Sequence, residues 1–127
     1  MQKQIEAVKI FHTAFEIGYS DTPLSSLGEN KHLLRYNLIK EENEEYLYAV
    51  QNNDLVEIAD ALGDMMYILC GTIIEHGLQD KMEAIFNEIQ NSNMSKLDEN
   101  GKPIYREDGK VLKGPNYFKP NFNKILE

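Results

Sequence analysis

Hydrophobic residues recur every three to four positions through most of residues 2–92, which is the spacing of one helix face. The first stretch places five residues on one side of such a helix, namely Ile5, Val8, Phe11, His12 and Phe15. Gly18 and Pro23 then break the pattern. The whole pattern predicts four helices, at about 2–17, 29–52, 54–77 and 80–91.

Several helix ends carry local signals. Asp54 is an expected N-cap, with Glu57 at the position that completes a capping box. Asp80 is likewise the expected N-cap at the start of the fourth helix, with Glu83 three residues further on. Gly77 follows His76 as an expected C-terminal glycine.

Residues 93–127 have a different character. Asn100-Gly101, Asp108-Gly109 and Gly114-Pro115 are turn signals, and the apolar pairs on either side of Asp108-Gly109 allow a small hairpin. The segment is nevertheless too apolar for a disordered linker, so we expect it to fold back onto the helical body or onto a partner subunit. We therefore predict one all-α domain over 1–127, an antiparallel bundle of about four helices completed by oligomerisation, with a helical body (1–92) and a substrate-covering or subunit-packing tail (93–127).

Composition narrows the classes of function. The 127 residues include 42% hydrophobic residues, enough for the core of a single domain, and the net charge of −8 argues against nucleic-acid binding. Residues 1–92 hold 6 Lys+Arg against 16 Asp+Glu, whereas residues 93–127 hold 7 against 5. The longest uncharged apolar run, Met65–Ile74, is too short to cross a membrane. With no signal-peptide pattern and only Cys70 as a thiol, we expect a cytoplasmic protein in which Cys70 packs in the core.

The second predicted helix holds four acidic residues within five positions. On a helical wheel, Leu38, Glu42, Glu45 and Ala49 form one stripe, so Glu42 falls in the middle of the apolar arc and Glu45 at its edge. Glu41 borders this stripe, whereas Glu44 points away as ordinary surface. The remaining members of the apolar arc are Ile39, Tyr46 and Val50.

The third predicted helix supplies further carboxylates. Asp60 and Asp64 are i, i+4 neighbours, and Glu57 extends the row by one turn. This row lies opposite the main apolar arc of Leu55, Ile58, Leu62, Leu69 and Ile73, so a solvated stripe is the competing interpretation.

The short link between the two helices requires them to pack nearly antiparallel, which brings Glu42 and Glu45 toward Asp60 and Asp64. An unpaired buried carboxylate is destabilising by several kcal/mol, on the order of a protein's net stability, so a cation is expected there. Arg35 and Lys40 are the only cationic residues nearby in the second helix. Oxygen-only ligands indicate a hard ion, Mg²⁺ or Mn²⁺.

Three elements taken together resemble the MazG-like all-α NTP pyrophosphatases, specifically the small phage and bacterial type that acts on deoxynucleoside triphosphates. The first is Arg35-x-x-Leu38-Ile39-x-Glu41-Glu42-x-x-Glu45, similar to an EExxE helix. The second is Asp60-Ala61-Leu62-Gly63-Asp64-Met65-Met66-Tyr67. The third is Asn93-Met94-Ser95-Lys96 followed by Asp108-Gly109-Lys110-x-Leu112-Lys113 and Asn116-Tyr117.

The resemblance implies a Mg²⁺-dependent pyrophosphohydrolase that splits a (deoxy)nucleoside triphosphate between its α and β phosphates, with no nucleic-acid or membrane partner. It also implies a homodimer or homotetramer. One of Glu41, Glu42 and Glu45 would activate water, and we add Asp60 to the metal ligands that the resemblance implies. Many relatives carry a glutamate where Ala61 stands, so an alternative register uses Glu57 and Asp60. The expected metal ligands are Glu41, Glu42, Glu45, Asp60 and Asp64, and the expected substrate-binding residues are Asn93, Lys96, Lys110 and Lys113.

Two other functions stay open from the sequence. One is a phosphoribosyl-ATP pyrophosphohydrolase on the same fold. The other is a non-catalytic acidic helical protein that oligomerises and binds a protein partner. The second would leave Glu42 on the apolar arc unexplained, and stabilisation by magnesium would separate it from an enzyme.

Overall fold

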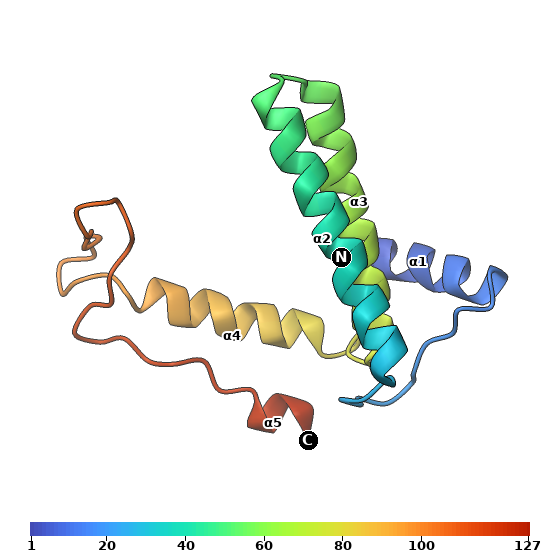
Figure 1. The fold of residues 1–127 in the computed structure, drawn as a ribbon. Helices are drawn as coiled ribbons and strands as arrows, with labels where there is room; N and C mark the ends of the chain where they lie inside the picture. Colours follow the sequence, from blue (N-terminus) through green and yellow to red (C-terminus); the bar gives the residue numbers. More distant parts are fainter. The chain divides into compact units, whose positions relative to one another are not determined.

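The computed structural model describes residues 1–127, and it is all-α with no β-strand, as predicted (Figure 1). Four main helices are followed by one short helix. Their bounds are Gln2–Ala14 (α1), Glu29–Gln51 (α2), Leu55–Glu75 (α3), Met82–Met94 (α4) and Asn123–Leu126 (α5). None of the helices is both long and apolar enough to cross a lipid bilayer.

The chain divides into two compact units, Met1–Gln79 and Asp80–Glu127. The boundary falls before α4, so this helix groups with the C-terminal tail. The expected single domain over 1–127 stays a prediction.

In the first unit, α2 and α3 form an antiparallel helical hairpin (Figure 1). The Asp54 side chain accepts a hydrogen bond from the Glu57 N–H at 3.1 Å, which confirms the predicted N-cap of α3. Ala49 on α2 and Ala61 on α3 are both buried, and these small side chains allow the two backbones to approach closely near the turn.

The core of the first unit lies where α1 packs on α3. It consists of Ile5, Val8, Cys70 and Ile74, each of which is at most 2% exposed. Burial raises the pKa of the Cys70 thiol, so this cysteine is an unreactive packing residue, as expected. Each fully buried aliphatic side chain of this kind contributes about 1.5–3 kcal/mol to folding.

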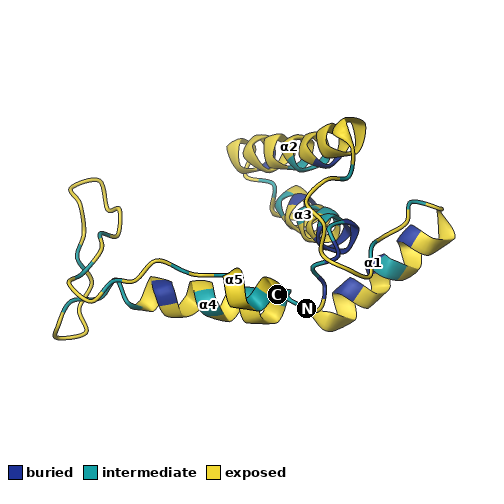
Figure 2. Cartoon of the chain, turned by 90° about the horizontal axis from the view of Figure 1, so that it is seen from below, coloured by how far each residue is buried: buried dark blue, intermediate teal, exposed yellow.

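The prediction for the apolar face of α3 was wrong for its three leucines, whereas Ile73 is buried and Ile58 is half-buried. Leu55, Leu62 and Leu69 are exposed, by 77%, 47% and 47%. The side that packs on α2 instead carries small or partly buried residues, including Ala61 and Ile68. The helical wheel failed for the leucines because α3 has apolar residues on nearly every side. Figure 2 shows that exposed positions dominate the α2–α3 hairpin.

In the second unit, α4 begins at Met82, so the expected N-cap at Asp80 is also wrong. Lys81 precedes the first helical residue and makes no capping hydrogen bond through its side chain. The helix continues to Met94, three residues beyond the predicted end near Asn91. The predicted hairpin is present in minimal form, as one antiparallel bridge between Tyr105 and Val111.

Candidate functional site

The side chain of Arg35 sets the register between α2 and α3. Its Nε donates to the Thr72 hydroxyl at 3.0 Å, and its Nη2 donates to the Ile68 carbonyl at 2.7 Å. Arg35 therefore lies opposite Thr72. Because the two helices run in opposite directions, seven residues (two turns) forward along α2 correspond to seven residues back along α3, which places residue 42 opposite residues 64–65. The register therefore places Glu42 across from Asp64, as the sequence predicted.

Glu42 is the most perturbed carboxyl group in the first unit. Partial burial raises its pKa to about 7, with further contributions from a hydrogen bond to Glu45 and from the charges of Glu45, Asp64 and Asp60. Its Oε2 atom is buried and has no hydrogen-bond partner. The structure thus brings four of the predicted ligands into one electrostatic cluster, with an unsatisfied oxygen at its centre.

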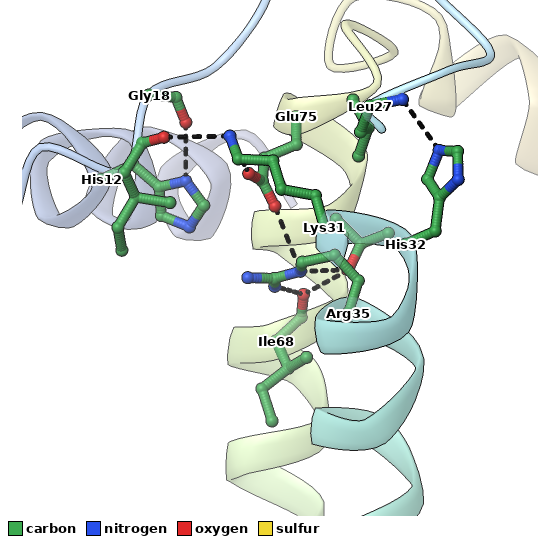
Figure 3. A network of polar contacts seen from close by, with 10 residues as sticks. His12, Gly18, Leu27, Lys31, His32, Arg35, Ile68 and Glu75 are labelled. Atoms are coloured by element: carbon green, nitrogen blue, oxygen red, sulfur yellow. Dashed lines mark hydrogen bonds and ion pairs between the residues drawn. The ribbon is translucent and has the colours of Figure 1, made fainter. Parts of the chain in front are cut away.

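Neither Arg35 nor Lys40 pairs with this cluster, and Figure 3 shows the Arg35 side chain directed at Glu75 instead. The Arg35 guanidinium pairs with the buried Glu75, with Nε and Oε2 3.2 Å apart, and Lys31 approaches the other Glu75 oxygen at 3.0 Å. Lys40 lines a separate groove of about 540 Å³ with Arg35, and none of the clustered carboxylates lines that groove. No positively charged side chain therefore offsets the negative charge around Glu42.

The sequence interpretation missed the buried Arg35–Glu75 network. Arg35, Glu42 and Ala49 are seven residues apart, so all three lie on the seam of α2, and that spacing could have revealed the role of Arg35. Behind the network, Gly71 brings the α3 backbone against α1. A Cβ atom there would lie 2.6 Å from Arg35 Nη2 and 2.8 Å from Nε2 of the buried His12.

An acidic groove of about 690 Å³ lies along the end of the hairpin nearest the turn. It contains three of the predicted ligands, Glu41, Glu45 and Asp60, but neither Glu42 nor Asp64. Glu44, which is exposed as predicted, also lines this groove. The remaining lining residues are Tyr48, Ala49, Asn52, Asp54 and Glu57.

The donors of this cluster fit a hard divalent cation. All are carboxylates, and the buried, unpartnered oxygen of Glu42 is the kind of group that a metal ion satisfies. In the conformation described, no three His, Cys, Asp or Glu side chains converge closely enough to hold an ion together. Glu41, Glu45, Asp60 and Asp64 are exposed, so rotation of their side chains is the movement that would bring oxygens around an ion.

The four expected substrate-binding residues all lie in the second unit. Asn93 is exposed on the last turn of α4, and its carbonyl accepts a hydrogen bond from the Lys96 N–H at 3.2 Å. Lys110 is exposed in the hairpin turn. The Lys113 ammonium lies over the Tyr117 ring, 4.9 Å from its centroid.

Comparison with protein families matches residues 8–93 to the family described as phosphoribosyl-ATP pyrophosphohydrolase. This match spans both carboxylate-bearing helices and most of the chain. The chain belongs to the phosphoribosyl-ATP pyrophosphohydrolase family. That family is part of the MazG-like all-α NTP pyrophosphatase superfamily that the sequence motifs resemble.

Membership of this family identifies the type of chemistry. Phosphoribosyl-ATP pyrophosphohydrolase family members act on phosphoric anhydrides, are typically Mg²⁺-dependent and use a nucleotide substrate. The match favours the phosphoribosyl-ATP alternative over the deoxynucleotide reading that the motifs suggested first. A comparison with curated protein sequences gave no match.

Proposed function

We propose that this protein is a Mg²⁺-dependent pyrophosphohydrolase that cleaves the anhydride between the α and β phosphates of a nucleotide. The preferred substrate is phosphoribosyl-ATP, which the family description names. The observation that carries the proposal is Glu42, a partly buried carboxylate with an unpaired oxygen and three further carboxylates around it. Such a cluster destabilises the protein by itself and becomes favourable when a cation joins it.

The proposed metal ligands are carboxylates from both helices of the hairpin. Bound Mg²⁺ supplies positive charge that neutralises phosphate oxygens as the anhydride breaks. Glu57 is a further candidate, because it lines the acidic groove together with Asp60. The ligands proposed first are Glu41, Glu42, Glu45, Asp60 and Asp64.

The carboxylates also supply the base. One of Glu41, Glu42 and Glu45 orients a water molecule and takes its proton while the water oxygen bonds to phosphorus. The anhydride bond to the leaving phosphate then breaks, and the products are a nucleoside monophosphate, or its phosphoribosyl adduct, and pyrophosphate. Asn93, Lys96, Lys110 and Lys113 are proposed to bind the phosphates through hydrogen bonds and positive charge.

Deoxynucleoside triphosphates are the second candidate substrates, and a specific observation supports them. The family match ends at residue 93, whereas the resemblance to the deoxynucleotide type includes Asn93-Met94-Ser95-Lys96 and the lysines of the following loop. Both candidates share a triphosphate, so the same carboxylates serve either reaction. They differ in whether the site accepts a second ribose phosphate on the base.

The test is pyrophosphate release from phosphoribosyl-ATP and from a panel of ribo- and deoxynucleoside triphosphates, with Mg²⁺ and with a chelator. The wild type is compared with Glu42→Gln and with Glu6→Gln, an exposed acid on α1 that serves as a matched control. We expect Mg²⁺-dependent release that Glu42→Gln abolishes and Glu6→Gln retains.

The pattern of substrates then chooses between the two candidates. Turnover of deoxynucleotides without turnover of phosphoribosyl-ATP would replace the first substrate by the second. Failure with every nucleotide, together with no thermal stabilisation by Mg²⁺, would overturn the enzymatic proposal and favour the acidic helical binding protein.

A further inference from the structure

Two serines at the C-terminal end of α4, Ser92 in its last turn and Ser95 directly after it, bind the backbone of a single residue in the tail. The Ser92 hydroxyl donates to the Phe118 carbonyl at 2.8 Å, and the Phe118 N–H donates to the Ser95 hydroxyl oxygen at 3.1 Å. The Ser95 hydroxyl in turn donates to the Ser92 carbonyl at 2.6 Å, so the two serines and Phe118 are joined by three hydrogen bonds. We call Ser92, Ser95 and the Phe118 backbone the serine clamp.

The serine clamp is partly buried within the second unit. Ser92 is only 3% exposed, although it is a polar residue on a mostly exposed helix. Further along the tail, the Glu88 carboxylate accepts from the Asn121 N–H at 3.1 Å. The clamp therefore begins a line of contacts along which the tail returns beside α4 (Figure 1).

The clamp closes the loop formed by residues 96–117. At the base of this loop the two chain segments touch, because a Cβ atom on Gly114 would lie 2.3 Å from the Leu97 carbonyl oxygen and 2.7 Å from that of Lys96. Only glycine allows this approach. The crossing brings the backbone of Lys113, the neighbour of Gly114, next to that of Lys96.

The two lysines at the loop base have no anionic partner within the protein. The ion pair within the loop joins Arg106 and Asp108, and this guanidinium lowers the pKa of the Asp108 carboxyl. The Asp98 carboxylate instead accepts backbone hydrogen bonds from Asn100 and Lys102. Two lysines that flank one crossing of the backbone, neither of them paired with a carboxylate, suit a phosphate or pyrophosphate group.

We propose that Ser92 and Ser95 are positioning residues, which hold the 96–117 loop closed so that Lys96 and Lys113 bind the terminal phosphates of the substrate. This inference rests on the proposed function, since it assigns these phosphates to a triphosphate. The clamp binds backbone atoms, so it works through geometry and takes no part in the chemical step. Its loss raises the dissociation constant for phosphates and leaves the breaking of the anhydride almost unchanged.

The test measures binding of inorganic pyrophosphate with Mg²⁺ by calorimetry, which does not depend on turnover. We expect Ser95→Ala and Ser92→Ala to weaken binding roughly five- to twentyfold, an effect that corresponds to about 1–2 kcal/mol at about 1.4 kcal/mol per tenfold. Ser95→Thr keeps the hydroxyl and should bind like the wild type. Ser26→Ala is the matched control, because Ser26 is exposed and its hydroxyl makes no hydrogen bond.

Two further readouts separate positioning from general stability. Hydrogen exchange at the Phe118 amide should accelerate in Ser95→Ala and not in Ser95→Thr. With the nucleotide that the enzyme hydrolyses, KM should rise as the pyrophosphate affinity falls, and kcat should change by less than twofold.

Several results would overturn the inference. Unchanged pyrophosphate affinity in Ser95→Ala would do so, whether or not exchange at Phe118 accelerates, and so would a wild type that does not bind pyrophosphate. A fall in kcat with constant KM would assign the serines to the chemical step. If no nucleotide is hydrolysed but pyrophosphate binding depends on Ser95, the proposed function fails while the clamp and its phosphate site stand.

Discussion

The guanidinium of Arg35 on α2 and the carboxylate of Glu75 on α3 form a buried ion pair, with Nε and Oε2 3.2 Å apart. The same guanidinium also binds the Ile68 carbonyl and the Thr72 hydroxyl, so one side chain makes three contacts to α3. The pair therefore fixes where α2 lies along α3. Because Glu42 is two turns from Arg35 on the same seam, this contact also determines which carboxylates face one another.

We expect Arg35→Met to lower the free energy of unfolding by about 3–5 kcal/mol, because it leaves Glu75 buried beside only a half-exposed lysine. Lys31→Met is the control and should lose less than about 1 kcal/mol, since its ammonium is 47% exposed. Urea denaturation measures both. A double variant, Arg35→Met with Glu75→Leu, should be more stable than Arg35→Met alone. Equal losses for Arg35→Met and Lys31→Met would contradict the assigned role.

The raised pKa of Glu42 predicts how the stability of the metal-free protein depends on pH. The group holds its proton more tightly in the folded state, where its pKa is about 7, than in the unfolded chain, where it is near 4.5. Its favourable contribution is therefore complete below about pH 4.5 and is lost as the pH rises through about 7. Thermal unfolding in chelator should show this decline, and Glu42→Gln should flatten it relative to Glu6→Gln.

Magnesium should reverse the same destabilisation. At pH 8 the wild type is expected to gain several degrees in Tm on addition of Mg²⁺, because the ion binds only the folded arrangement of carboxylates. Glu42→Gln should be more stable than wild type without Mg²⁺, since one repelling charge is gone, and should gain little when the ion is added. A similar gain in both proteins would show that Glu42 is not a ligand.

Two glycines of α3 offer a matched pair of substitutions. Gly71→Ala places a methyl group within 3 Å of Arg35 Nη2 and His12 Nε2, and overpacking of this kind is destabilising by about 1–3 kcal/mol. Gly63→Ala meets no atom within 4 Å and should stabilise the helix by about 0.5–1 kcal/mol. Differential scanning calorimetry should therefore show Tm changes of opposite sign. Loss of stability in both would mean that α3 has a different environment in solution.

The exposed leucine row of α3 predicts self-association. Leu62 and Leu69 are each 47% exposed on one side of the helix, and a second copy of the chain is the expected cover. Leu62→Lys with Leu69→Lys should shift the mass measured by light scattering to that of a monomer, while Ile10→Lys on α1 should not. A wild type of 14.6 kDa in solution would contradict the expected dimer or tetramer.

Much of the helical framework could be predicted from the sequence. The Asp54 N-cap and the four main helices follow from local patterns that depend on a few neighbouring residues. The start of α4 was misplaced because Asp80 has the right residue type but lies outside the helix. Local signals identify candidate caps, and the packing of the chain chooses among them.

The carboxylate cluster was predicted in part. The wheel placed Glu42 on the packed side of α2, and the structure agrees, since Glu42 is half-buried and Ala49, seven residues further on, is buried. The same method failed on α3, which is apolar on nearly every side, so the leucine row was taken for the core. The groove that joins Glu44 to Glu41 and Glu45 also needed the neighbouring helix to be in place.

The sequence by itself determined the all-α class, the helices that carry the acidic residues and the resemblance to nucleotide pyrophosphohydrolases, because these depend on residue type and spacing. Only the tertiary structure decided the register of α2 on α3, the engagement of Arg35 by Glu75 and the serine clamp on Phe118. The reason is physical. Each of these joins residues from 23 to more than 30 positions apart, and such contacts depend on how whole helices and loops pack, which no local pattern specifies.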